Sequence, residues 1–500
     1  MKQSTIVIGG GIGGLAASIL LAKKGYDVTL VEKNETLGGR ANVFEADGFR
    51  FDMGPSWYLM PDVFEHFFEL IGEKVETHLD LIRLDPSYRI HFRDTGDTVD
   101  MRSDVASDSE IFEKFEPGSS QQLQLYLDKS KYQYDIAIKY FMYKNYDTVF
   151  DFMNLRTMVE GRRLHVFEKM HTYVARHFKT DIIQKIMEYQ LVFLGSSPYN
   201  TPALYNIMSH IDFNMGVYYP RGGIYSLIEA LVSIAKKSGV TFVTGDAADA
   251  IHVSNKRATG VRLESGRELS ADIVVSNADI HHTDTELLPE GSREHNDTYW
   301  ASRTLAPSAF IMYLGLKKRV PGLVHHNLAF GGDWKKGFSE IFDEPTWPSD
   351  PSYYVCCPSK TDDSVAPKKR ENLFVLVPVS PELDMSIEKT KQYREKVLDL
   401  LERDFGIADI RSQVQYERLY TSTDFLKDYN AFGGSALGLA HTIKQTAIFR
   451  PNNVSRKVKN LYYAGAGTNP GIGMPICLIS AELAYKRIVG DKSDGPLTQL

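Results

Sequence analysis

The chain has 500 residues, more than one hydrophobic core usually holds, so we expect at least two structural regions that share a large interface. Its hydrophobic fraction of 43% and charged fraction of 24% are ordinary for a soluble globular protein. The net charge of −7, from 57 Lys and Arg against 64 Asp and Glu, gives no reason to expect nucleic acid as a partner. The aromatic residues are mainly Tyr (27) and Phe (26), with 4 Trp, which suits either a long apolar cavity or a large α/β core.

Cysteine usage indicates a reducing, cytoplasmic compartment. The three cysteines are Cys356, Cys357 and Cys477. The adjacent pair rarely forms a disulfide, and the spacing is not that of a metal site, so no metal is expected. Residues 5–22 carry no charge, but five glycines between Gly9 and Gly14 break this stretch into strand, turn and helix. No other uncharged run approaches the ~20 residues of a membrane span. If the protein meets a membrane, we expect it to lie on the surface.

The N-terminal residues have the pattern of a strand–helix–strand unit. Residues 5–8 are a short apolar run, as expected of a strand buried on both faces. A glycine-rich turn follows, and residues 15–24 have helical spacing that ends at Gly25. Residues 27–31 predict the second strand, which closes on Glu32.

The remaining chain changes character twice. Residues 106–214 have few glycines and many helix formers, with aromatic residues dense over 126–152, so we expect an inserted, mainly helical region. Strand patterns return at 241–243, 258–263 and 272–275, the last leading into 276–279. A second sheet is indicated by residues 309–314 and 373–377. The polar residues 491–500 are expected to form a disordered tail.

Gly9, Gly11 and Gly14 satisfy the pattern G-x-G-x-x-G. The first glycine makes the tight turn, the second lets backbone approach a pyrophosphate, and the third lets helix and strand pack closely. The phosphates then lie at a helix N-terminus, where free N–H groups and the helix dipole favour negative charge. Glu32 ends the next strand about 20 residues later, where its carboxylate can meet a ribose hydroxyl. A dinucleotide site is therefore predicted here.

The residues after Glu32 favour FAD as the dinucleotide. Gly38, Gly39 and Arg40 follow it, and an arginine after a glycine pair can donate paired hydrogen bonds to a pyrophosphate. NAD enzymes of this fold do not need that element. A flavoprotein reduced by NAD(P)H would usually carry a second glycine-rich nucleotide loop; none is visible, and residues 220–223 lack the spacing. We therefore expect FAD without a nicotinamide site, and oxygen or a quinone as the electron acceptor.

A third element lies near the C-terminal end. Residues 460–463 predict a strand that leads into glycines, and 476–488 predict a helix with Pro475 in its first turn. The N-terminus of this helix could stabilise negative charge on a reduced flavin ring. An ordinary capped helix has the same pattern, so both interpretations stay open.

These motifs resemble those of the bacterial and archaeal phytoene desaturases, carotenoid-forming members of the flavin amine-oxidase-like group. The matching stretches occur in the family's order over residues 1–490: 8–16, 32–40, 52–56, 216–223, 325–327, 449–453 and 465–475. The resemblance implies an α/β fold, with a glutathione-reductase-type Rossmann FAD-binding domain and an inserted α+β substrate domain. The FAD-binding domain would comprise 1–105, 215–285 and 455–490. The substrate and membrane-facing domain would comprise 106–214 and 286–454.

The resemblance also assigns cofactor contacts by position. The adenosine and pyrophosphate contacts would be Gly9, Gly11, Gly14, Glu32, Gly38, Gly39 and Arg40. Gly54, Pro55 and Ser56 would lie near the flavin ring, the Ala248 backbone would meet adenine, and the ribityl and ring contacts would include Gly465, Ala466, Gly473, Met474 and Pro475. The chain departs from relatives at Ala466, where the wider group often has an acidic residue, and at Asn469, where many members have histidine. These departures leave open which desaturation, and how many steps, the enzyme performs.

The implied reaction is FAD-dependent dehydrogenation of a C40 or C30 polyene at the surface of the cytoplasmic membrane. Loss of a hydride leaves an allylic cation that gives up a proton easily, so positioning matters more than a strong base. We therefore predict no particular catalytic residue. Structural roles are expected for His325, His326, His210, Asp212 and Arg221.

Two apolar segments could meet the substrate or the membrane. The helical face over 61–71 is expected to pack in the core, with membrane contact or tunnel lining as alternatives. Residues 126–152 are the better candidate for surrounding the substrate.

Three other functions stay open. The chain could be an amine or porphyrinogen oxidase of the same group, or a sister enzyme such as a hydroxycarotenoid desaturase or an isomerase. It could also be a non-catalytic prenyl-lipid escort protein that keeps the fold and loses the flavin. The intact set of glycines with Glu32 and Arg40 argues against the escort protein.

Overall fold

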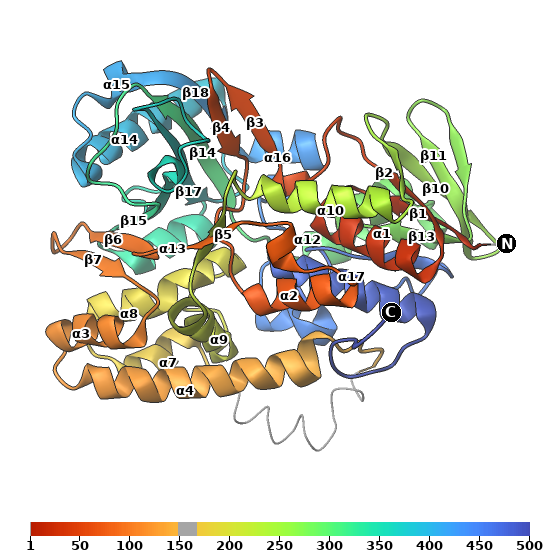
Figure 1. Ribbon diagram of the computed structural model, residues 1–500, viewed down its shortest axis with the longest axis horizontal. Helices are drawn as coiled ribbons and strands as arrows, with labels where there is room; N and C mark the ends of the chain where they lie inside the picture. Colours follow the sequence, from red (N-terminus) through yellow and green to blue (C-terminus); the bar gives the residue numbers. More distant parts are fainter. Residues whose placement is uncertain (1, 149–167) are drawn as a thin grey trace.

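The computed structural model describes residues 2–148 and 168–500. The sheet that contains the N-terminal strand is parallel (Figure 1). The strands of this five-stranded sheet are β1 (Ser4–Ile8), β2 (Asp27–Val31), β9 (Thr241–Val243), β13 (Ile273–Ser276) and β19 (Leu461–Tyr463). They lie in the order β19-β13-β1-β2-β9, and every neighbouring pair is parallel. The strands expected at 5–8 and 27–31 are confirmed, and segments far apart in the sequence complete the sheet around them.

Both faces of this sheet are covered, which explains why its strands are continuous apolar runs. One face packs against α1 (Ile12–Lys24), α10 (Tyr225–Lys237) and α17 (Met474–Val489). The other face packs against a three-stranded antiparallel sheet made of β10 (Ala248–Ser254), β11 (Arg257–Leu263) and β12 (Glu268–Ser270). Side chains of β1 alternate accordingly, with Val7 in the helical core and Ile6 and Ile8 in the other.

The second large sheet has seven strands and lies beside the first (Figure 1). Its strands, in spatial order, are β18 (Val414–Tyr420), β14 (Ser308–Leu316), β17 (Glu371–Val379), β16 (Tyr353–Cys356), β15 (His326–Phe330), β6 (Tyr88–Phe92) and β7 (Thr98–Met101). All neighbours are antiparallel except β15 and β6. On one face Phe310, Met312 and Leu314 pack against α14 (Ile387–Phe405), and on the other Ile311 and Tyr313 join a second core.

The inserted region is helical where the structure describes it, as its composition predicts. Its helices are α3 (Val105–Phe115), α4 (Ser119–Ala137), α7 (Met170–His177), α8 (Asp181–Glu188) and α9 (Ile207–His210). They gather below the seven-stranded sheet in Figure 1 and share a core with the sheet face that carries Ile311 and Tyr313. Together with the two large sheets, this arrangement confirms the predicted α/β class. No helix in the described ranges is long and apolar enough to cross a membrane.

Two features differ from what the sequence suggested. β6 and β7 belong to the segment assigned to the FAD-binding domain, yet they pair within the seven-stranded sheet. The residues 491–500, expected to be a disordered tail, instead lie along α17, where Leu497 N donates to Glu482 Oε1 at 2.7 Å. The tail is held because Lys486, buried on α17, also bonds to the Gly495 carbonyl. The division of the chain into two domains stays a prediction.

Candidate functional site

A cavity of about 1000 Å³ is lined by residues of both large sheets. It is lined by every predicted cofactor residue except two: Gly9, Gly11, Glu32, Gly38, Gly39, Arg40, Gly54, Pro55, Ser56, Ala248, Ala466, Gly473, Met474 and Pro475. Gly14 and Gly465 do not line the cavity. A Cβ on Gly14 would stand 2.0 Å from the Gly9 carbonyl oxygen, so this glycine serves the close packing of helix on strand. The contacts of these residues with FAD stay a prediction.

The turn after β1 presents backbone to the cavity. Gly11 is the N-terminal cap of α1, and the Gly38 N–H donates to the Gly10 carbonyl at 2.8 Å, which joins the two glycine segments. No acidic side chain occupies the first turn of α1. The free N–H groups of this turn and the helix dipole therefore form a site for an anionic group.

Glu32 is held rigidly at the cavity wall. Its side chain is buried; Oε2 accepts the Gly10 N–H at 2.7 Å, and Oε1 accepts the Asn34 N–H at 2.9 Å. Each carboxylate oxygen keeps a second lone pair. The carboxylate can thus order the glycine turn and still accept hydrogen bonds from the two hydroxyls of a ribose.

Arg40 is the clearest test of whether a dinucleotide fits. Its Nε and Nη2 atoms are buried, and no hydrogen-bond partner for them exists in the described part of the chain. Its guanidinium carbon lies 5.7 Å from the centre of the Tyr429 ring. Buried donors left unpaired cost about 1–3 kcal/mol each, so these atoms call for an anion in the cavity. The pyrophosphate of FAD supplies one, and the residues present fit the cofactor.

Beyond the phosphate turn, the cavity walls are apolar and aromatic. One wall is the seven-stranded sheet, which contributes Ile311, Leu328, Phe330, Tyr354, Phe374 and Leu376. Further apolar lining comes from the end of α4, the residues after it, and α9; it includes Tyr134, Phe141, Met142, Ile207 and Met208. Part of the stretch 126–152 thus surrounds the cavity, although its last residues, 149–152, lie outside the described residues. By contrast, the apolar side chains of α2 (Pro61–Leu70) are buried in the core, as expected.

Comparison with known proteins decides the family. The model of the flavin-containing amine oxidoreductase family matches residues 12–489. The chain belongs to this family. Among its relatives, the carotenoid 3,4-desaturase of Haloarcula japonica is 48% identical over 98% of both chains. The zeta-carotene-forming phytoene desaturase of Myxococcus xanthus is 37% identical over 97% of this chain and 93% of the relative. A 4,4'-diapophytoene desaturase of Staphylococcus haemolyticus is 34% identical over 98% and 99%.

Solved structures show the same fold. An oxidoreductase from Methanosarcina mazei matches with a TM-score of 0.66 and 16% identity, covering 97% of this chain and 100% of that one. Cyclohexylamine oxidase from Brevibacterium oxydans matches with a TM-score of 0.61 and 16% identity, covering 98% and 99%. The predicted family and Rossmann-type fold are therefore confirmed. The protein is an FAD-dependent oxidoreductase.

Two residues beside the candidate cofactor site of this flavoenzyme, Asn277 and Arg450, have roles that were not predicted. Asn277 follows β13 and lines the cavity; its Nδ2 donates to the Gly9 carbonyl at 3.3 Å. A Cβ on Gly13 would stand 2.5 Å from Asn277 Oδ1. Asn277 thus packs directly against the phosphate turn. Its position immediately after a predicted strand, at the carboxyl edge where such sheets bind ligands, was the available signal.

Arg450 fixes the glycine-rich loop of the flavoenzyme through hydrogen bonds to main-chain carbonyls. The side chain is buried, and it donates to the carbonyls of Ala466 at 2.7 Å, Thr468 at 3.0 Å and Leu439 at 3.3 Å. Burial lowers the pKa of Arg450 to about 10, so it still carries its charge at neutral pH. The sequence marks 449–453 as a family stretch but does not reveal this role, because the partners are main-chain atoms.

The residues expected to be structural do not line the cavity. Asp212 Oδ2 accepts from Tyr88 at 2.6 Å, Gln190 at 2.8 Å and Tyr189 at 3.2 Å, and burial raises the pKa of Asp212 to about 6. His210 lies 2.7 Å from the Asn214 amide, and Arg221 pairs with Asp80 at 2.7 Å. His325 and His326 are buried behind the wall. The structure gives none of them a place beside a bound substrate.

Proposed function

We propose that this flavoenzyme is a carotenoid desaturase, which removes hydrogen from two neighbouring carbons of a C40 or C30 polyene and so extends its conjugation. The observation that carries the proposal is the continuity of the cavity. It begins at the phosphate turn and continues between apolar walls, and its volume of about 1000 Å³ is at the upper end of ordinary ligand sites. The names of the relatives from Haloarcula, Myxococcus and Staphylococcus support the same substrate class.

The protein's own contribution would be positioning. When bound, FAD supplies an acceptor for hydride. Glu32 and Arg40 would hold the adenosine and pyrophosphate, while Trp57, Leu328 and Tyr354 would keep the polyene extended and exclude water. An allylic cation loses a proton readily, so the positioning of the polyene and the exclusion of water that could trap the cation matter more than a strong base.

Pigment analysis is the direct test. The gene is expressed in a host that makes phytoene, in one that makes the C30 analogue, and in one that makes hydroxylated carotenoids. We expect coloured products with longer conjugation in at least one host, and none with Gly11→Val. Unchanged polyenes together with turnover of amines by the purified protein would favour the amine-oxidase alternative. Protein that never holds flavin would favour the escort protein.

We further propose that oxygen or a quinone reoxidises the flavin. The support is the absence of a second glycine-rich nucleotide loop in the sequence. In anaerobic assays, the reduced protein should regain its oxidised flavin spectrum with a quinone, and with oxygen on exposure to air, but not with NAD(P)+. Efficient, saturable reoxidation by NAD(P)+ contradicts this proposal.

We also propose peripheral association with the cytoplasmic membrane, because a polyene gains about 0.8 kcal/mol for each CH₂ that leaves water. Such a molecule stays in the bilayer, so the enzyme must touch lipid to receive it. Phe449 marks a suitable opening, since it lines the cavity and is 56% exposed. The neighbouring Asn452 donates to the Tyr146 carbonyl at 2.9 Å, which joins this segment to the residues after α4.

A further inference from the structure

Two histidines and a cysteine meet behind the cavity wall, outside the site described above. Antiparallel pairing of β15 with β16 places His326 opposite Cys356, and His325 directly precedes His326. One nitrogen of each imidazole and the Cys356 sulfur all lie within 4.8 Å of one another, and all three side chains are buried. Trp57, which lines the cavity, stacks on the His326 ring with 4.3 Å between the ring centres.

The hydrogen bonds of both histidines leave one ring nitrogen unused. Nδ1 of His325 lies 2.7 Å from Thr361 Oγ1, and Nδ1 of His326 lies 2.7 Å from the Tyr354 hydroxyl. The Nε2 atoms of both rings are buried and have no hydrogen-bond partner among the residues that the structure describes. When Nδ1–H donates to a hydroxyl oxygen, Nε2 presents a lone pair, which is the arrangement found behind metal-bound histidines.

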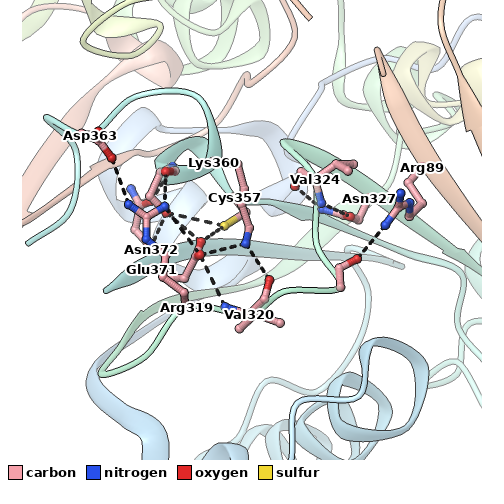
Figure 2. Close-up of polar contacts among 12 residues, drawn as sticks. Arg89, Arg319, Val320, Val324, Asn327, Cys357, Lys360, Asp363, Glu371 and Asn372 are labelled. Atoms are coloured by element: carbon pink, nitrogen blue, oxygen red, sulfur yellow. Dashed lines mark hydrogen bonds and ion pairs between the residues drawn. The ribbon is translucent and has the colours of Figure 1, made fainter. Parts of the chain in front are cut away.

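Figure 2 shows hydrogen bonds of residues that neighbour this cluster in the sequence, among them Val324, Asn327 and Cys357. Asn327 accepts the Val324 N–H at 2.9 Å and donates to the Val324 carbonyl at 2.7 Å, which fixes the turn that carries the histidines. Directly after β16, Cys357 donates its thiol to the buried Glu371, and its N–H donates to the His325 carbonyl at 2.7 Å. Hydrogen bonds therefore fix the backbone next to all three side chains.

We propose that His325, His326 and Cys356 bind one thiophilic metal ion of the Zn²⁺ class, through the two Nε2 atoms and the thiolate. Two imidazoles and a thiolate are a donor set that suits Zn²⁺ or Cu⁺. Ligand atoms around a tetrahedral ion with bonds of about 2.0–2.3 Å stand about 3.5 Å apart, so small side-chain rotations complete the site.

Protonation states make the binding stoichiometry specific. A metal ion binds imidazole in its neutral form and cysteine as the thiolate, so binding at this site transfers the Cys356 thiol proton to the solvent. Each ion bound should therefore release about one proton. The bound ion would link β15 to β16 next to Trp57 and so stabilise this part of the cavity wall.

The test uses the full-length, FAD-loaded protein, stripped with a chelator and then equilibrated with Zn²⁺ at pH 8. After desalting, elemental analysis should find about one zinc per chain, with release of about one proton during binding. Co²⁺ in place of Zn²⁺ should give a thiolate-to-metal charge-transfer band. Cys356→Ala should weaken Zn²⁺ binding at least about a hundredfold, whereas the matched control Cys357→Ala, whose thiol bonds to Glu371, should keep the ion.

Several outcomes overturn the proposal: wild-type protein that retains no zinc, binding without proton release, or Cys356→Ala that binds as tightly as wild type. If Cys356→Ala does not fold, the proton count and the Co²⁺ spectrum of the wild-type protein decide. Flavin absorbance is recorded in every sample, so loss of the FAD site is distinguished from loss of the metal site. Carotenoid turnover plays no part in this test.

Discussion

Arg40 carries two buried donors, Nε and Nη2, that no described residue satisfies. We predict that Arg40→Met weakens FAD binding about 10–100-fold, because two charge-assisted hydrogen bonds to the pyrophosphate are lost. The apoprotein should be no less stable than wild type, since the unpaired donors are removed with the charge. Flavin titration of the apoprotein measures the first effect and thermal unfolding the second. Arg221→Met, which removes an exposed ion pair outside the cavity, is the control. Equal affinity of wild type and Arg40→Met contradicts the assignment.

Gly11 is the second residue with a sharp test. A Cβ at this position would stand 3.1 Å from Asn277 Nδ2, at the point where backbone faces the cavity. Gly11→Val should therefore abolish flavin binding, measured as loss of the visible flavin spectrum after purification. Gly291→Val is the matched control, because nothing lies within 4 Å of a Cβ there. A Gly11→Val protein that keeps full flavin occupancy would show that the cofactor lies elsewhere.

For single residues, the sequence predicts contacts that lie within one local unit of structure. The spacing of Gly9, Gly11 and Gly14, and the later Glu32, lies within one strand–helix–strand unit whose geometry is standard. Asn277 escapes such prediction, because it reaches Gly9 only through the pairing of β13 with β1. The role of Arg450 could not be predicted either, because its partners are main-chain carbonyls and no residue type marks them in the sequence.

Among the elements, the Asp212 carboxyl joins β6 to the short helical segments that follow α8 and α9. Its folded pKa of about 6 lies above the usual value of 3.8, so its stabilising, protonated form is lost as pH rises through 6. Asp212→Asn has no titrating carboxyl at this position, so the variant does not lose this stability as pH rises. We predict that the free energy of unfolding of Asp212→Asn, relative to wild type, rises by up to about 2 kcal/mol between pH 4.5 and pH 8. Urea unfolding at both pH values measures it, and a difference that does not change with pH refutes the role given to this carboxyl.

Periodicity identifies elements more readily than it identifies their neighbours. The apolar runs at 309–314 and 373–377 predict strands, and the structure places them side by side as β14 and β17. The parallel pairing of β6 with β15 joins Arg89 to Asn327, and no local pattern marks it. The meeting of His326 with Cys356 likewise depends on strand register. Register is set by the packing of whole faces, which a single sequence does not display.

For the whole molecule, the prediction concerns the membrane. The protein should float with liposomes, and more so when they contain phytoene. Phe449→Asp should lower the floated fraction, because an exposed apolar side chain at the cavity opening is replaced by a charge. Ile387→Asp is the control: Ile387 is 75% exposed, but it begins α14, on the sheet face away from the cavity. Protein that stays wholly soluble while it converts liposome-embedded phytoene at full rate contradicts membrane association.

The strand order of the parallel sheet also bears on synthesis. Ribosomes deliver β1, β2, β9 and β13 long before β19 at Leu461–Tyr463, yet β19 pairs directly with β13. Until then β13 presents an open edge, and α17 cannot cover the sheet. Arg450 and the loop it anchors arrive equally late. The flavin site can therefore close only when almost the entire polypeptide has emerged, so a chain that terminates before β19 should not bind flavin.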